Sequence, residues 1–274
     1  MLYWLSAFSD TIEPLNVLRY ITFRTGGAMF TALVLAFLFA PYIIAMLRAR
    51  QVRMIRPAGL IMLSALVIST VLWSNPANRY VWIVLGVTLG FGLIGLRDDY
   101  LAAARQSGLS DKIRIALAAG IAALACLALI HLGSPQSATS LRARTFDLGW
   151  LSIPIGALII VAAAQVVNLA DKLRARVIGP LLLLALSFGV VLFFAGNRVA
   201  ADYFNIRYVP GIGELAVLCG AVTGAGLGFG SFNAPPASKL VGATGSLAIG
   251  AMFGAMAVAA KYGVVVALSL TAQG

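Results

Sequence analysis

The sequence has 274 residues, of which 61% are apolar and only 11% are charged. A soluble domain carries roughly 25% charged residues to cover its surface, so this composition excludes a soluble globular protein. The net charge of +11 comes from basic residues that lie between apolar blocks. They are not interleaved with aromatic side chains, as they are on nucleic-acid-binding surfaces. We therefore expect a membrane protein with no nucleic-acid partner.

The apolar residues gather in blocks, most of which are about as long as a helix needs to cross a ~30 Å hydrocarbon core. We predict membrane-spanning helices at about residues 25–47, 57–74, 79–96, 113–132, 151–169, 178–195, 212–229 and 245–260. A further apolar stretch, 262–270, is too short to cross and is interpreted as the start of a ninth helix. The sequence thus predicts an all-α fold, a polytopic helical bundle that forms one domain over residues 1–274.

The positions of Lys and Arg predict how this bundle is oriented. If the first span runs from outside to inside, the inner segments are 48–56, 97–114, 170–177 and 230–244. These short segments hold twelve of the twenty basic residues. Because Lys and Arg accumulate in cytoplasmic loops, an outside N-terminus is favoured.

Several glycines recur at every fourth position inside the predicted spans. This spacing lets helix backbones approach each other closely in lipid. The run from Gly224 to Gly228 also resembles a dinucleotide-binding loop, but that motif needs a strand before it and a helix start after it. We therefore predict helix packing at the pairs Gly86/Gly90, Gly220/Gly224, Gly224/Gly228 and Gly250/Gly254.

The first polar group that could carry chemistry is Asp98-Asp99-Tyr100, at the predicted inner end of the third span. Two neighbouring carboxylates can hold Mg²⁺, which prefers oxygen ligands. They can also take a proton from a phosphate or hydroxyl nucleophile. An acidic pair at the membrane boundary, neutralised by Arg97, explains the same residues equally well, and both interpretations stay open here.

The second polar group is Asn168 and Asp171, at the predicted inner end of the fifth span. Residues three apart share one face of a helix, so both side chains can point into one cleft. A polar helix end that meets water is the simpler interpretation and is favoured from these residues alone. The next basic residues, Lys172, Arg174 and Arg176, can bind phosphate or anchor the inner end of the helix.

The third polar group is the predicted loop from Phe232 to Ser246, which contains two prolines, two glycines and several hydroxyl side chains. A loop of this composition exposes backbone N–H groups. Such groups next to a helix start suit a pyrophosphate or a nucleoside.

In chain order, these segments resemble the phospho-N-acetylmuramoyl-pentapeptide transferase family, also called translocase I. That family is related to the transferases that join sugar 1-phosphates to polyprenyl phosphates. The matching stretches are Asn16–Tyr20, Asn78–Leu85, Gly90–Tyr100, Val167–Asp171, Gly213–Leu215, Gly224–Phe229, Phe232–Ser238 and Thr244–Ala248. Together they cover nearly the whole chain in the right order.

The resemblance implies a reaction, a cofactor and a location. The family transfers a sugar 1-phosphate from a UDP-activated precursor to undecaprenyl phosphate, releases UMP and forms lipid I for peptidoglycan, with Mg²⁺ bridging the pyrophosphate. The expected partners are therefore UDP-N-acetylmuramoyl-pentapeptide, undecaprenyl phosphate and the lipids of a bacterial inner membrane, and a homodimer is left open. We expect catalytic roles for Asp98, Asp99 and Asp171, Mg²⁺ ligation by Asp98 and Asp99, and substrate binding by Asn168, Asn233 and Lys172.

The sequence departs from the family pattern at the second and third polar groups. Lys172 stands where the family has a glycine, and Arg174 stands where it has a second aspartate. The family's Phe-Met-Gly-Asp is here Leu240-Val-Gly-Ala243, which removes a carboxylate and an aromatic side chain. These changes remove negative charge and add positive charge, so we expect weaker binding of Mg²⁺.

Two further departures concern length. The family's long inner loop between the first two spans is reduced to about 51–59 and lacks the lysine expected there. The sequence also ends at Gly274, before the later helices and the histidine-rich inner loop of the family, so we expect a truncated descendant. Two hypotheses remain: a transferase with a reduced site, and a non-catalytic relative that keeps the scaffold and a lipid-phosphate or nucleotide groove. Weak or absent activity is expected.

Overall fold

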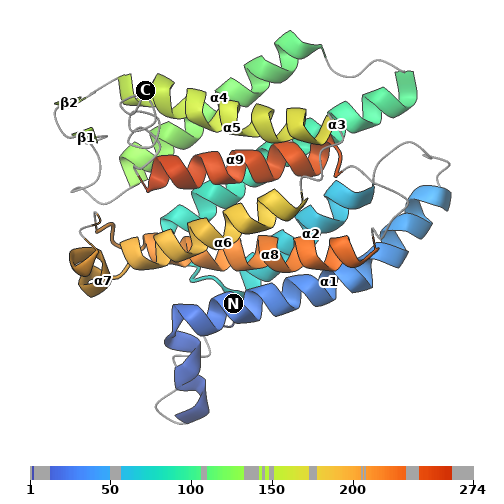
Figure 1. The fold of residues 1–274 in the computed structure, drawn as a ribbon. Helices are drawn as coiled ribbons and strands as arrows, with labels where there is room; N and C mark the ends of the chain where they lie inside the picture. Colours follow the sequence, from blue (N-terminus) through green and yellow to red (C-terminus); the bar gives the residue numbers. More distant parts are fainter. Residues whose placement is uncertain are drawn as a thin grey trace.

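Helices make up nearly all of the fold, as seen in a computed structural model (Figure 1). The structure describes residues 2, 13–49, 57–105, 110–132, 142–143, 146–147, 151–172, 178–204, 206, 208–232 and 241–260. The α-helices in these ranges are α1 (Ile21–Ala49), α2 (Pro57–Trp73), α3 (Arg79–Arg105), α4 (Asp111–Leu132), α5 (Ser152–Lys172), α6 (Ile178–Ala195), α7 (Arg198–Tyr203), α8 (Leu215–Phe232) and α9 (Ala243–Ala259). Two 3-10 segments are η2 (Glu13–Arg19) and η4 (Ile212–Glu214). The two-residue strands β1 (Arg142–Ala143) and β2 (Phe146–Asp147) pair antiparallel.

The helices confirm the predicted class, an all-α polytopic membrane protein. Within the described ranges, α1, α3, α4, α5, α6 and α8 are long and apolar enough to cross a membrane. The apolar helices α2 and α9 have 17 residues each and are shorter. Helices form here because a chain surrounded by hydrocarbon must satisfy its backbone hydrogen bonds within the segment. The predicted ninth helix at 262–270 lies outside the described residues.

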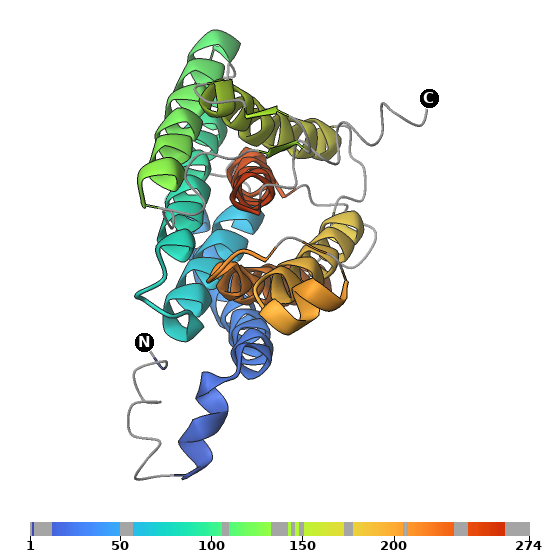
Figure 2. The ribbon, with the colours of Figure 1, turned by 90° about the vertical axis from the view of Figure 1, so that its left-hand side faces the viewer.

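Helix α9 lies in the middle of the bundle, as the end-on view shows (Figure 2). Almost all of its residues are buried, and it packs mainly on α3 and α5. Glycines permit this close packing: a Cβ at Gly250 would lie 2.8 Å from the carbonyl oxygen of Ala163, and one at Gly254 would lie 2.8 Å from the Cα of Ile160. Close backbone contact replaces the hydrophobic driving force that lipid does not supply between helices.

Helix α8 is the second buried helix, and it is surrounded by α1, α6 and α2. A Cβ at Gly224 would collide with the carbonyl oxygen of Met29 on α1, and one at Gly228 would lie 2.7 Å from the Cβ of Ala36. The packing interpretation of the glycine run is therefore confirmed. Gly86 is an exception, because a Cβ there would have no neighbour within 4 Å among the described residues.

The polar ends of the helices extend further than the apolar blocks predict. Helix α3 continues to Arg105 instead of ending near residue 96, so Asp98 and Asp99 lie on a helix. Helix α1 begins at Ile21, which places Arg24 inside it. Hydropathy marks where a span leaves the membrane, but backbone hydrogen bonds continue the helix into the polar region.

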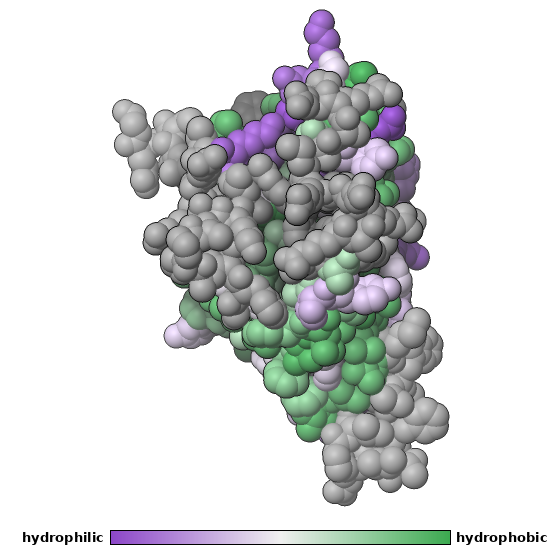
Figure 3. Space-filling model, turned by 90° about the vertical axis from the view of Figure 1, so that its right-hand side faces the viewer, coloured by the Kyte–Doolittle hydropathy of each residue, from purple (hydrophilic) through white to green (hydrophobic). Residues whose placement is uncertain are grey.

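The helix ends that border the predicted inner segments all lie at one end of the bundle, which is the right-hand end in Figure 1. There α1, α3, α5 and α8 end, and α2, α4, α6 and α9 begin. Viewed from that side, hydrophilic residues gather in the upper part of the molecule and an apolar surface lies below them (Figure 3). We call this end the site end.

Candidate active site

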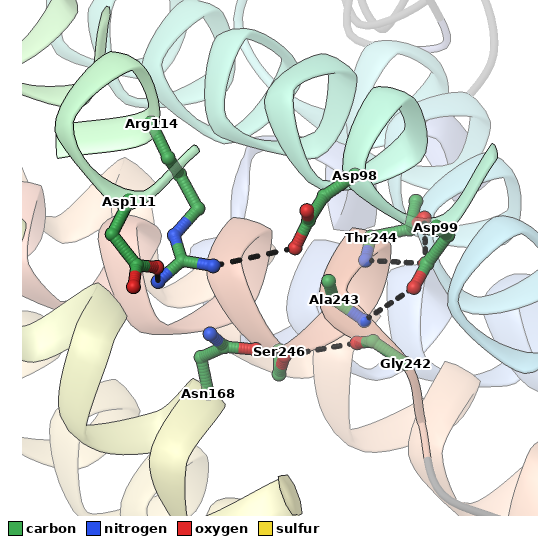
Figure 4. A network of polar contacts seen from close by, with 9 residues as sticks. All are labelled: Asp98, Asp99, Asp111, Arg114, Asn168, Gly242, Ala243, Thr244 and Ser246. Carbon is green, nitrogen blue, oxygen red and sulfur yellow. Dashed lines mark hydrogen bonds and ion pairs between the residues drawn. The ribbon is translucent and has the colours of Figure 1, made fainter. Parts of the chain in front are cut away.

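Asp99 lies on α3 and binds the start of α9 (Figure 4). Its carboxylate accepts hydrogen bonds from the backbone N–H groups of Ala243 (3.2 Å) and Thr244 (3.0 Å). The hydroxyl of Thr244 donates a third hydrogen bond to the same carboxylate at 2.6 Å. The N–H groups in the first turn of a helix have no partner within the helix, and a negative charge beside them is favourable.

Asp171, on α5, binds the two residues that directly precede α9. Its two carboxylate oxygens accept hydrogen bonds from the backbone N–H groups of Val241 and Gly242, both at 2.9 Å. Gly242 is the N-cap of α9 and has φ of 87°, a conformation that favours glycine. Because glycine has no side chain with which to cap the helix, the two aspartates from α3 and α5 supply the acceptors instead. We call Asp99 and Asp171, with the N–H groups of residues 241–244, the carboxylate clamp.

Asn168 lies on the same face of α5 as Asp171, as their spacing predicts. The hydroxyl of Ser246 is 3.1 Å from Asn168 Oδ1 and 2.9 Å from the carbonyl oxygen of Gly242. Both α5 side chains are buried and face α9. The simpler interpretation, a helix end that meets water, is therefore wrong for Asn168 and Asp171.

Asp98 faces a different partner from its neighbour Asp99. Arg114, in the first turn of α4, reaches Asp98 at 3.4 Å and Asp111 at 2.7 Å. Arg114 and Asp98 are both buried. Adjacent residues of a helix do not share a face, and Figure 4 shows the two carboxylates pointing apart. Arg114 on the next helix thus pairs with Asp98, a partner that the sequence did not suggest.

Lys172 is the one remaining predicted site residue that the structure describes. Lys172 lies at the end of α5 and is exposed at the site end. Asn233, Arg174 and Leu240 lie outside the described residues. Ala243, which stands where the family has an aspartate, is buried, and its N–H group is bound by Asp99.

The described carboxylates do not fit Mg²⁺ as they stand. A divalent cation needs several oxygen ligands that face one point. Asp99 and Asp171 direct their oxygens at N–H donors, whose positive ends repel a cation, and Asp98 faces a guanidinium group. Across the ranges that the structure describes, no group of three or more His, Cys, Asp or Glu side chains could hold a metal ion.

One polar contact that was not predicted is a buried ion pair at the other end of the bundle. Arg24 on α1 donates to both carboxylate oxygens of Glu214 on η4, at 2.7 and 2.5 Å. The backbone N–H group of Asn75 donates to the same carboxylate at 3.2 Å. A lone base and a lone acid, each beside an apolar block, are the signal that could have predicted the pair. A buried acid or base is usually tolerated because a group of opposite charge is buried beside it.

The fold and the site together define a polytopic membrane protein in which carboxylates from two helices meet the start of a third. The chain belongs to the phospho-N-acetylmuramoyl-pentapeptide transferase family, within glycosyl transferase family 4, whose sequence model matches residues 81–261. Two similar proteins, both named phospho-N-acetylmuramoyl-pentapeptide-transferase, come from Rhodopseudomonas palustris strains BisA53 and BisB18. Each is 50% identical to this chain, and the match covers 98% of the chain and 81% of the relative.

Proposed function

We propose that this chain transfers the phospho-N-acetylmuramoyl-pentapeptide group from its UDP precursor to undecaprenyl phosphate, at a low rate, and so forms lipid I and UMP. One observation carries the proposal: Asp98 and Asp99 on α3 and Asp171 on α5 all lie at the site end, where α9 starts. Family membership and the names of the two relatives support the same reaction. The distribution of Lys and Arg supports a site end that faces the cytoplasm across a bacterial inner membrane.

In this reaction an oxygen of the lipid phosphate attacks the phosphorus atom that carries the sugar. A new P–O–P link forms, the link to UMP breaks, and UMP leaves. Asp98 is suited to accept the proton of a protonated lipid phosphate, because a positioned carboxylate can act as a general base. Arg114 holds that carboxylate, and exposed Lys172 offers a positive charge to the anionic substrates.

The low rate follows from the charges at the site. Phosphoryl transfer depends on positive groups that neutralise the developing charge, and Mg²⁺ commonly supplies them. The clamp already engages two of the three carboxylates, and Arg114 engages the third. We therefore assign no step of the reaction to a metal ion, and we expect Mg²⁺ to accelerate it little.

The engaged carboxylates also favour a second candidate, a scaffold without catalytic activity. In that case Asp99 and Asp171 serve only to hold α9 against α3 and α5. The chain would then keep a polar surface at the site end for a lipid phosphate or a nucleotide.

The experiment that separates the two candidates is UMP release by the purified full chain. UDP-N-acetylmuramoyl-pentapeptide and undecaprenyl phosphate are supplied in detergent micelles, with and without Mg²⁺. We expect slow release that Asp98→Ala lowers by about 10²-fold or more, as for the loss of a general base. The matched control is Asp202→Ala, because Asp202 is an exposed acid on α7.

Each outcome assigns the chain to one class. UMP release that depends on Asp98 and not on Asp202 supports the slow transferase. No release above a reaction without protein overturns it in favour of the scaffold. Release that rises steeply with Mg²⁺ and needs both Asp98 and Asp99 would show that the clamp opens to bind a metal ion.

A further inference from the structure

An apolar groove of about 320 Å³ lies between α1 and α6 and has α8 as its floor. Its lining comes from the first turns of α1, the second half of α6 and the first half of α8. These segments lie at the end of the bundle opposite the site end. The groove is therefore separate from the carboxylate clamp and has no part in the proposed reaction.

The groove suits hydrocarbon, because two of its three threonine hydroxyls are used within their own helices. Its lining is almost wholly apolar. The hydroxyl of Thr25 donates to the carbonyl oxygen of Ile21 at 2.9 Å, and that of Thr223 donates to the carbonyl oxygen of Cys219 at 2.8 Å. Both hydroxyls are thus satisfied within their own helices and do not require a polar ligand.

Glycines create the shape of the groove. A Cβ at Gly220 would lie 2.5 Å from the carbonyl oxygen of Thr25, and one at Gly189 would lie 3.3 Å from the Cβ of Cys219. The backbones of α1 and α6 therefore pack closely on α8. A Cβ at Gly26, which also lines the groove, would meet nothing within 4 Å. The open space in front of Gly26 is part of the groove and is available to a ligand.

The chain around this end of the groove carries residues typical of a membrane–water interface. Arg19 and Tyr20 directly precede α1, Arg198 and Tyr203 lie on α7, just after α6, and all four are exposed. Tyrosine favours the head-group level of a bilayer, and arginine attracts anionic lipids. Asp202 on α7 opposes the two arginines with one negative charge.

We propose that this groove binds one acyl chain of an anionic glycerophospholipid, whose phosphate lies near Arg19 and Arg198. Both helices that border the groove are membrane spans, so lipid surrounds it. An acyl chain in the groove replaces loose lipid contacts by van der Waals contacts with three helices. The two arginines select an anionic head group over a zwitterionic one.

Photo-crosslinking of the full chain tests the proposal. The protein is reconstituted in bilayers of phosphatidylethanolamine and phosphatidylglycerol that contain a trace of phosphatidylglycerol with a diazirine on its acyl chain. Adducts are then mapped by mass spectrometry. We expect them to concentrate on residues 22–29 of α1 and 186–194 of α6, and to fall about tenfold in Gly26→Leu, the equivalent of about 1.4 kcal/mol of binding.

The matched control is Gly120→Leu on α4, since Gly120 is also exposed and also has no neighbour within 4 Å of an added Cβ. Val190→Phe, which fills the groove from α6, is a second blocking variant in case Gly26→Leu does not fold. The double variant Arg19→Gln/Arg198→Gln should lower labelling by the phosphatidylglycerol probe to the level of a phosphatidylcholine probe.

Three outcomes would overturn the proposal. Adducts spread evenly over α4 and α6 would show that the groove holds no particular chain. Labelling unchanged in both blocking variants would place the lipid elsewhere. Few lipid adducts in the groove, together with a dimer of the protein in the same bilayers, would assign the groove to a second copy of the chain. None of these results depends on transferase activity.

Discussion

Asp99 lies on α3 and accepts three hydrogen bonds from α9, so it connects two helices through residues that are at least 144 positions apart in sequence. We expect Asp99→Ala to lower the free energy of unfolding by about 1–3 kcal/mol, because it leaves two N–H groups and a hydroxyl at a helix start without acceptors. Asp99→Asn keeps one acceptor oxygen and should cost less. Thermal unfolding in micelles, followed by tryptophan fluorescence, measures the difference.

Exposed Lys172, changed to Ala, is the control for this prediction, since it lies at the same end and outside the clamp. If Asp99→Ala unfolds at the same temperature as the parent chain, the carboxylate does not hold α9. In that case Asp99 is available for the chemistry that the family resemblance implies.

For the residues of the clamp, the position along the bundle could be predicted from the sequence, but the hydrogen-bond partners could not. The sequence located Asp98, Asp99, Asn168 and Asp171 at one end of the bundle, because hydropathy shows where each span ends. It could not identify the partners of these side chains. The N–H groups of residues 241–244 belong to the backbone, which carries no sequence signal, and their approach to α3 and α5 depends on the packing of α9.

Helices α1 and α8 approach each other so closely that a side chain cannot be added at Gly224. We expect Gly224→Leu to separate them and to lower the unfolding temperature strongly, since overpacking alone costs typically about 1–3 kcal/mol and here the obstacle is backbone. Gly86→Leu is the control, because its added side chain enters open space on α3. Equal unfolding temperatures for the two variants would contradict this account of the packing.

The helices themselves could be predicted where apolar blocks have clear limits. The predicted span at 178–195 agrees with α6 (Ile178–Ala195), and the span at 57–74 agrees with α2 (Pro57–Trp73) to one residue. The short elements η2, η4 and α7 were not predicted, because they are too short to produce a hydropathy signal. Arg24 lies one residue before the first predicted span and Glu214 lies near the start of the predicted span 212–229, so hydropathy alone did not indicate that the two side chains pair.

The whole molecule has two chemically different ends. The site end carries the carboxylates, Arg114 and Lys172. The opposite end carries the buried pair of Arg24 and Glu214 and an exposed border of tyrosines and arginines. This arrangement suits a transferase that takes its water-soluble substrate at one side only, and it makes the orientation in the membrane a direct test of the assignment.

We expect the site end to face the cytoplasm, because the predicted inner segments, which adjoin the helix ends there, hold twelve of the twenty Lys and Arg residues. Lys172→Cys reports on the site end and Tyr203→Cys on the opposite end, since both positions are exposed. The native residues Cys126 and Cys219 are buried and should contribute little background. In spheroplasts, a membrane-impermeant maleimide should label Tyr203→Cys directly and Lys172→Cys only after permeabilisation. The reverse pattern would place the carboxylates outside the cell, where no UDP-linked precursor is available, and would exclude the proposed reaction together with the orientation.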